Sequence, residues 1–289
     1  MQRPTLLTAL KKIGQNDKMA LVSIPLKPKH EQMMKVVKRI VLVFYGFNYF
    51  NGFFIHFPYR IDVTNNSTMT PCVGMEPLTA TPNKQICLIL LAAQEMTIVV
   101  VVLNFQALLL FLIAHTAAMY QMLAYEMDAL RESLNENLLE NMELIRETLS
   151  TMIVRHSLTM DVVDLLKSLY SVPLGVNFCT NAVCICLFFY LPLREWLQFM
   201  PLLVYCFVVF FLYCFLGQRL VNSAELFERM VYSCGWENFE MKEKRLVLVM
   251  LRQTQKRVEL LAADIIPVNI YTFATTMQAI FKFITVVKF

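Results

Sequence analysis

The apolar run at residues 86–123, ICLILLAAQEMTIVVVVLNFQALLLFLIAHTAAMYQML, limits most strongly what this chain can fold into. A helix that spans a bilayer needs about 20 mostly apolar residues, and this run is too long for one span of ordinary tilt. We therefore predict one helix that crosses the membrane and continues beyond it. The chain is 57% hydrophobic and 17% charged, whereas soluble domains have about 45–50% apolar and about 25% charged residues. An integral membrane protein is indicated.

Four more stretches have the length and apolar character of spans, at 40–59, 172–193, 196–217 and 264–289. The expected fold is therefore an all-α, polytopic helical membrane protein with five spans. The expected connections are an N-terminal segment at 1–39, loops at 60–85, 124–171 and 218–263, and a short turn at 192–196.

Two independent signals predict the orientation. Residues 1–39 carry nine Lys and Arg against two acidic residues, which favours a cytoplasmic N-terminus. The stretch TNNST at 64–68 holds two overlapping N-glycosylation acceptors, at Asn65 and Asn66, which predict an extracellular loop after the first span. Such tripeptides also arise by chance. With five spans the C-terminus is extracellular, and 124–171 and 218–263 are cytoplasmic.

The segments expected in the cytoplasm have helical periodicity. In 124–171, apolar residues recur at three- and four-residue steps, as in an amphipathic helix with one apolar stripe. These residues are Leu130, Leu134, Leu138, Met142, Ile145, Leu149 and Met152. Residues 218–235 and 242–262 show similar patterns. A packed helical layer follows, either with contacts between subunits or as an intramolecular bundle only.

The eight cysteines do not have the spacing of a disulfide framework or a zinc site. Six lie within or at the ends of apolar runs, where cysteine packs as a small apolar residue: Cys87, Cys179, Cys184, Cys186, Cys206 and Cys214. Cys72 lies in a polar loop, and a bridge from it to Cys87 is the alternative. No metal or other cofactor is expected.

Motifs for catalysis do not occur: there is no HExxH, no GxSxG and no Gly-rich phosphate loop, so we expect no enzyme. Asp161 and Asp164 are spaced like a pair that holds a metal bound to a diphosphate, but a solvated helix face is the simpler interpretation. Glu95 lies within a span and is a functional candidate, or it lies near the outer interface or bonds to a neighbouring helix. Asn104, Gln106 and His115 could join helices.

Aromatic residues are concentrated in the first span. They could line an apolar pocket for a small volatile ligand, or they could face lipid and form an interfacial belt. They are Phe44, Tyr45, Phe47, Tyr49, Phe50, Phe53, Phe54, Phe57 and Tyr59.

The C-terminal third contains Tyr213-Cys214, Gly217, Ser223 and Trp236, followed by Pro267-Val268-Asn269, and with these residues it resembles insect odorant receptors. That family shows an aromatic-Tyr-Cys, a Gly, Leu-x-x-Ser, Tyr and Trp, and then a segment leading into Pro-Val-Asn and Thr-Phe. The matching residues are Tyr213, Cys214, Gly217, Leu220, Ser223, Tyr232, Trp236, Arg252, Gln255, Lys256, Pro267, Val268, Asn269, Thr272 and Phe273. Departures include Arg257 where Pro is usual and Lys282 where Ser is frequent. The resemblance also implies seven spans, of which the first two are absent here.

The resemblance implies an odorant-gated, non-selective cation channel in the plasma membrane that assembles as a heterotetramer with a co-receptor. It places the ligand among the spans at 40–59, 86–123 and 196–217, where depth and chemistry select the candidates. These are Tyr45, Asn48, Phe50, Phe54, Leu91, Gln94, Leu202 and Tyr205. The alternatives are a gustatory receptor, whose final-helix signature does not fit, a small transporter, for which no internal repeat is found, and a non-functional receptor fragment.

The final span carries one polar stripe. At about 100° per residue, five residues fall on one side of a helix: Tyr271, Thr275, Gln278, Lys282 and Thr285. Phe273, Met277, Ile280 and Ile284 fall roughly opposite. The resemblance makes the polar stripe pore-lining, and polar packing against a neighbouring helix is the alternative. Lys282 would repel permeant cations unless its amino group extends to the outer interface.

Overall fold

The computed structural model describes residues 3–22, 27–61, 82–136 and 142–288. Seven α-helices, one short 3₁₀ helix and one two-stranded β-pair occur in this part of the chain. They are α1 (Arg3–Val22), α2 (Lys27–Ile61), α3 (Asn83–Glu136), α4 (Met142–Phe188), α5 (Leu193–Tyr232), η2 (Trp236–Asn238), α6 (Met241–Thr254), β1 (Leu261–Ala262), β2 (Ile266–Pro267) and α7 (Ile270–Lys288). The antiparallel strands pair Leu261 with Pro267.

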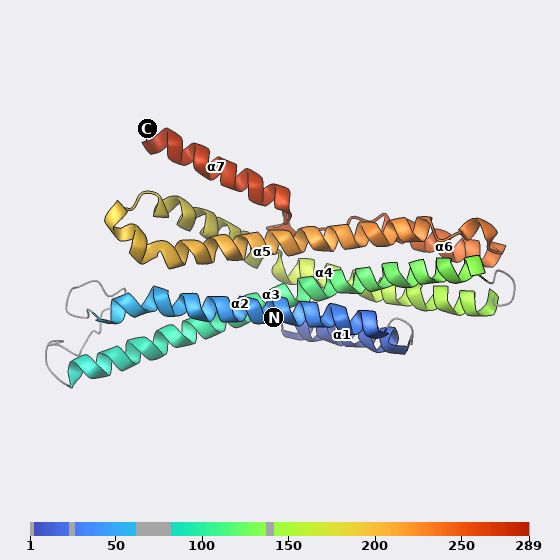
Figure 1. The fold of residues 1–289 in the computed structure, drawn as a ribbon, viewed down its shortest axis with the longest axis horizontal. Coiled ribbons are helices and arrows are strands. Elements are labelled where there is room, and N and C mark those ends of the chain that lie inside the picture. Colours follow the sequence, from blue (N-terminus) through green and yellow to red (C-terminus); the bar gives the residue numbers. More distant parts are fainter. Residues whose placement is uncertain (1–2, 23–26, 62–81, 137–141, 289) are drawn as a thin grey trace.

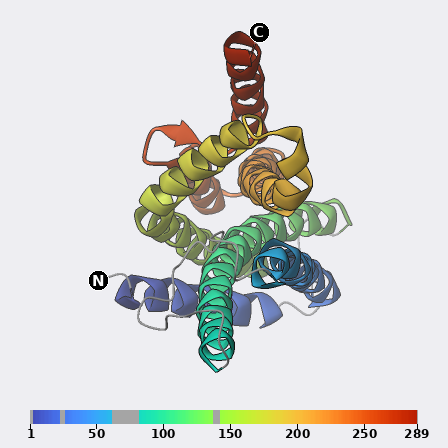
Figure 2. The same cartoon turned by 90° about the vertical axis from the view of Figure 1, so that its left-hand side faces the viewer.

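The long helices α2 to α5 run along the long axis of the molecule, and α3 packs against α2, α4 and α5 (Figure 1). The core is densest around the second half of α3, where Leu110, Leu112, Ile113 and Leu123 are fully buried. Figure 2 shows α1 on one flank of this bundle and α7 projecting from the opposite side. The predicted helical fold is confirmed.

The prediction that 86–123 forms one continuous helix is confirmed, because α3 runs from Asn83 to Glu136. That this helix crosses the membrane and continues beyond it stays a prediction. The apolar stripe of 124–171 does not lie on one helix, however. It is divided between the end of α3 and the start of α4, and its members Leu130, Leu149 and Met152 are buried. These two helices pack against each other, so Leu130, Leu149 and Met152 are covered within the chain itself.

Three helices of the described residues are long and apolar enough to cross a membrane: Gln85–Ser133, Ile145–Phe188 and Phe199–Asn238. They contain the span predicted at 86–123 and most of those predicted at 172–193 and 196–217. The spans expected at 40–59 and 264–289 fall in α2 and α7, which are not among the three. These two spans stay predictions.

The helix predicted over 242–262 is wrong in its second half, because α6 ends at Thr254. The chain then forms the β1–β2 hairpin, whose tip is tied to α4. The Ala263 amide donates to the Ser171 carbonyl at 2.8 Å, and Ser171 Oγ donates to Asp264 Oδ1 at 2.6 Å. Ala263 and Asp264 have φ values of 52° and 58°, in the left-handed region. Because this anchoring is tertiary, helical periodicity in the sequence does not reveal it.

The last span was also predicted to begin too early, since α7 starts at Ile270 rather than at 264. Cys87 is disulfide-bonded, so it does more than pack as a small apolar residue. Its expected alternative partner, Cys72, and the sequon residues Asn65 and Asn66 lie outside the described residues.

Candidate functional site

Polar side chains join α2, α3 and α5 in the half of the bundle that holds the aromatic first span. The Tyr45 hydroxyl on α2 donates to Asn104 Oδ1 on α3 at 2.6 Å. From α5, the Tyr205 hydroxyl donates to Gln106 Oε1, also on α3, at 2.9 Å. The two tyrosines therefore reach α3 from different helices, and the prediction that Asn104 and Gln106 join helices is confirmed.

Two asparagines of α2, Asn48 and Asn51, complete this group. We call it the α2–α3–α5 cluster, and its other members are Tyr45, Asn104, Gln106 and Tyr205. The Asn51 amide donates to the Pro201 carbonyl of α5 at 2.7 Å. Asn48 is buried and donates to the carbonyl of Phe44 at 2.7 Å, while its Oδ1 accepts no hydrogen bond in the part of the chain described here. A buried acceptor without a donor is costly, so Asn48 Oδ1 is a position where a ligand hydroxyl would be favoured.

The structure brings together only some of the predicted ligand residues. Tyr45, Asn48 and Tyr205 belong to the cluster, whereas Phe50 and Gln94 are exposed on this chain. Leu91 is half-buried, and Leu202 packs beside Ile280 of α7. The side chains of Phe54 and Glu95 lie outside what the structure describes. Asn51 was missed, although its spacing of three residues from Asn48 puts both on one helix face.

The helix α7 has two different faces. Phe273 and Met277 pack against the main core, and Ile280 and Ile284 belong to a second apolar cluster with Ile185 and Cys206. The polar stripe points away from these contacts: Tyr271 is 74% exposed, Gln278, Lys282 and Thr285 are exposed, and Thr275 is half-buried. The predicted division into an apolar and a polar face is therefore present.

The base of α7 is held both by hydrogen bonds and by burial, since Val268 and Thr272 are buried. Asn269 Oδ1 caps the helix by accepting from the Thr272 amide at 2.8 Å. The Thr272 hydroxyl donates to the Pro267 carbonyl at 2.6 Å, which ties the first turn to the hairpin. Gly217 of α5 lies against this point, since a Cβ there would be 2.1 Å from the Val268 carbonyl oxygen. The start of α7 is thus fixed although most of its length is exposed.

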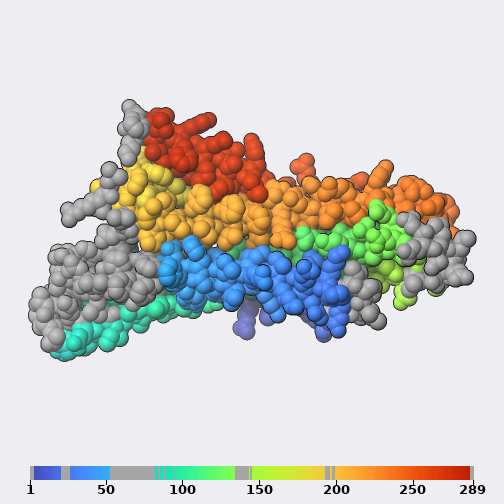
Figure 3. All heavy atoms as spheres, viewed as in Figure 1, coloured from blue at the N-terminus to red at the C-terminus, as the bar shows by residue number. Residues whose placement is uncertain are grey.

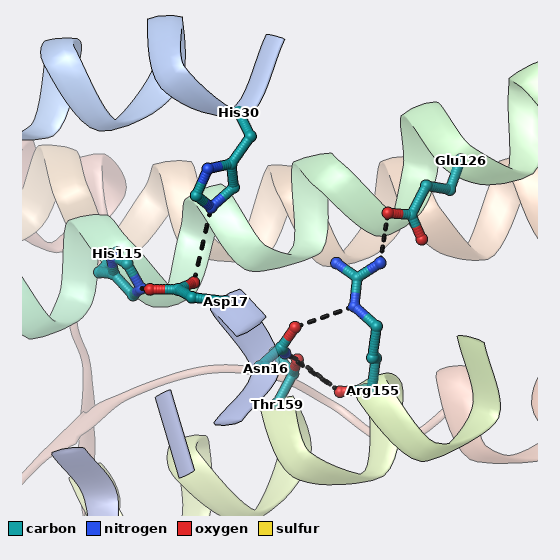
Figure 4. Close-up of polar contacts among 7 residues, drawn as sticks. All are labelled: Asn16, Asp17, His30, His115, Glu126, Arg155 and Thr159. Carbon is teal, nitrogen blue, oxygen red and sulfur yellow. Dashed lines mark hydrogen bonds and ion pairs between the residues drawn. The ribbon is translucent and has the colours of Figure 1, made fainter. Parts of the chain in front are cut away.

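A buried polar network links α1 to α3 and α4 at the other end of the bundle (Figure 4). Arg155 of α4 is 2% exposed and donates to Glu126 of α3 and, at 3.0 Å, to Asn16 Oδ1 of α1. The Asn16 amide donates to Thr159 Oγ1 at 2.9 Å. These residues are separated by long stretches of sequence, so no local pattern pointed to them.

Asp17 of α1 extends the same network. Its carboxylate oxygens lie 3.2 Å from Nε2 of His115 and 3.6 Å from Nε2 of His30 (Figure 4). Burial raises the pKa of Asp17, but the two histidines outweigh burial and bring the pKa of that carboxyl below its ordinary value. Asp17 therefore stays ionised and holds α1 to α2 and α3.

The described residues contain no group of three or more His, Cys, Asp or Glu side chains that could hold a metal ion. Asp161 pairs with Lys12 of α1, while Asp164 is exposed. This pairing assigns Asp161 to the contact between α1 and α4. The polar features of the chain are thus the α2–α3–α5 cluster, the exposed polar face of α7 and the buried network around Arg155.

Comparison with known proteins supplies the family. A family model described as "7tm Odorant receptor" matches residues 6–281. The odorant receptor coreceptor of Aedes aegypti is 23% identical over 149 residues, which cover 50% of this chain and 31% of the relative. Odorant receptor 10a of Drosophila melanogaster is 24% identical over 184 residues, which cover 61% of this chain and 45% of the relative. The matches thus span less than half the length of these relatives.

Solved structures show the same fold. The insect olfactory receptor OR5 from Machilis hrabei, in complex with eugenol, superposes with a TM-score of 0.70 over 91% of this chain and 68% of that chain, at 13% identity. A second structure of the same receptor gives a TM-score of 0.69 over 98% of this chain and 79% of that chain, also at 13% identity. Similarity at this identity concerns the fold alone.

Proposed function

Because the chain belongs to the odorant receptor family whose model matches residues 6–281, we propose that it is a receptor subunit that binds small apolar odorants. Together with the odorant co-receptor it gates a non-selective cation channel as a heterotetramer. The family match supports the expectation of a receptor rather than an enzyme, and it favours an odorant receptor over a gustatory receptor or a transporter. The protein is a multi-pass helical membrane protein.

The proposed orientation puts the start of α3 outside the cell and the α1–α4 network inside. The basic composition of 1–39 supports it. The disulfide bond of Cys87 is a further support, because disulfides persist in oxidising compartments and are rare in the cytosol. Cys87 lies in the first turns of α3, next to the loop that carries the sequon residues Asn65 and Asn66.

The exposed polar face of α7 is the observation that carries the channel proposal. The apolar face of α7 packs against the chain, and its polar face does not. This pattern is typical of a helix that contacts water on one side. In a tetramer, one such helix from each subunit would place Tyr271, Thr275, Gln278, Lys282 and Thr285 along a central path. Among the described residues, no helix covers that face.

Cysteine accessibility tests the channel proposal. The chain is expressed with the co-receptor, and currents evoked by an odorant panel are recorded before and after a charged thiol reagent. Gln278→Cys should make the current sensitive to the reagent, because residue 278 lies on the polar stripe. Phe283→Cys is the matched control, since Phe283 is also exposed on α7 but lies about 140° away around the helix. Equal sensitivity of both variants, or no odour-evoked current, contradicts the proposal.

We place the ligand in the α2–α3–α5 cluster, with Tyr45, Asn48 and Tyr205 as its polar groups. Tyr205→Phe removes the hydroxyl that donates to Gln106, and loss of one such hydrogen bond is worth about 0.5–1.5 kcal/mol. The odorant concentration for half-maximal current should therefore shift by roughly two- to twelvefold. Tyr190→Phe, at an exposed tyrosine beyond the cluster, is the control. An unchanged dose response in Tyr205→Phe and in Tyr45→Phe places the ligand elsewhere.

A further inference from the structure

A cavity of about 190 Å³ lies between α3, α4 and the segment that follows α6. Its charged lining consists of Lys167 and Asp164 from α4 and of Lys256 and Arg257 from the segment after α6. Three cations and one carboxylate give the lining a formal charge of 3 − 1 = +2. No residue of the α2–α3–α5 cluster or of the polar stripe of α7 lines it, so it is separate from the proposed ligand and pore positions.

The cations of this cavity, Lys167, Lys256 and Arg257, have no salt-bridge partner among the residues that the structure describes. The Lys167 amino group donates to the Arg257 carbonyl at 3.4 Å, which holds the two sides of the cavity together. Lys256 and Arg257 are exposed. Positive charge of this density attracts an anion.

The floor of the cavity presents a second, independent feature. Tyr120 of α3 lines the cavity and is 1% exposed, and its hydroxyl has no hydrogen-bond partner in the part of the chain that the structure describes. A buried hydroxyl without a partner costs about 1–3 kcal/mol. A ligand with several acceptor oxygens would satisfy Tyr120 at the floor and the cations at the rim at the same time.

We propose that this cavity binds the phosphate group of a small cytosolic molecule. A phosphate offers acceptor oxygens to the fork of an Arg guanidinium, to two Lys ammonium groups and to a Tyr hydroxyl. The source is cytosolic because the proposed orientation puts this end of α3 and α4 inside the cell, and to that extent the inference rests on the proposed function.

Occupancy of this site would act on α7. Lys256 and Arg257 begin the segment that leads through the hairpin to α7, and Leu260 in that segment accepts from the Val268 amide at 2.9 Å. A phosphate held by both cations would fix this segment against α3 and α4. The site is therefore placed to change how firmly the base of α7 is held.

The binding test uses the purified chain in phosphatidylcholine nanodiscs, with inorganic phosphate and ATP as probes and chloride at equal ionic strength as reference. Saturable binding is expected by titration calorimetry. Lys256→Gln with Arg257→Gln should weaken it at least about tenfold, and Tyr120→Phe by roughly threefold. Arg245→Gln removes an exposed cation of α6 outside the cavity and should change affinity less than about twofold. Hydrogen exchange at 255–269 should slow on binding.

Three results overturn the proposal: no saturable binding of either probe, equal weakening by Arg245→Gln, or loss of probe binding when the nanodisc also carries phosphoinositide. The last result would assign the phosphate to a lipid. Unchanged exchange at 255–269 in the presence of bound probe would overturn the link to α7. The assay needs no odorant and no co-receptor, so its failure is distinguishable from failure of the receptor proposal.

Discussion

The first and last helices of the chain are attached to the bundle in opposite ways. α1 buries Asn16 and places Asp17 between His30 of α2 and His115 of α3, and its Lys12 pairs with Asp161 of α4. α7 is fixed at its base by a cap and lies on the bundle through one apolar face, with its polar side chains exposed. Figure 3 shows α7 standing above the surface formed by α5. The contacts of α1 are thus made within the chain, whereas α7 leaves a polar face exposed, which the channel proposal assigns to the pore.

The largest effect is expected where the charges of the network are buried. Arg155→Ala leaves Glu126 buried, at 8% exposure, without its cation. Removing one partner of a buried pair costs about 3–5 kcal/mol. Thermal unfolding in detergent should therefore occur at a clearly lower temperature, with release of α1 seen by hydrogen exchange at 3–22.

Two controls sharpen this prediction. Arg131→Ala breaks the exposed pair with Asp128 and should cost less than about 1 kcal/mol. Glu126→Leu combined with Arg155→Met removes both charges and should recover most of the stability. If Arg155→Ala unfolds no earlier than Arg131→Ala, the attachment of α1 does not depend on the network.

The next effect concerns the contact that positions the base of α7. In Gly217→Ala the added Cβ would lie 2.1 Å from the Val268 carbonyl oxygen, which is backbone and cannot turn aside. Overpacking of this kind costs about 1–3 kcal/mol. Gly14→Ala is the matched control, because no atom lies within 4 Å of its Cβ and Ala is the better helix former by about 0.8–1.0 kcal/mol. Unfolding free energies that move in the same direction for both variants would contradict this account.

A smaller effect is expected from the cap of α7. Asn269→Ala removes the acceptor of the Thr272 amide, and loss of such a cap costs about 1 kcal/mol. Because the cap acts on the first turn of α7 only, hydrogen exchange should speed up at 270–275 and leave α1 unchanged. Exchange that speeds up equally in both helices would mean that α7 is not an independent unit.

The contrast between α1 and α7 also shows what the sequence could predict. The two faces of α7 and the continuity of α3 follow from local periodicity, and both are present. The pairing of Arg155 with Asn16 and Glu126 joins residues distant in sequence, so no spacing rule reveals it, and α1 itself was missed within 1–39. The hairpin after α6 was mistaken for helix because its fold depends on Ser171 and Gly175 of α4.

A pH dependence is expected from Asp17 on α1. Its pKa lies below the ordinary value of 3.8, so its contacts stabilise the fold above that pH, and the stabilisation is lost as pH falls through the folded-state pKa. Asp17→Asn should lower stability at neutral pH and reduce the slope of unfolding free energy against pH below about 4. Asp128→Asn, at an exposed acid, serves as control. If the unfolding free energy falls equally steeply with decreasing pH in Asp17→Asn and in the unmodified chain, Asp17 does not contribute to the attachment of α1.

The smallest effect on stability, and the sharpest test of the comparison, is expected from Lys282→Ser. Lys282 is exposed on the polar stripe of α7 and forms no salt bridge within the described residues, so unfolding should change by less than about 0.5 kcal/mol. If this amino group faces permeant cations, its removal raises single-channel conductance of the complex with the co-receptor. Lys282→Arg keeps the charge and should leave conductance unchanged. Equal conductance in all three proteins would place the Lys282 amino group at the outer interface, and the polar stripe would then face the ions only through its neutral members.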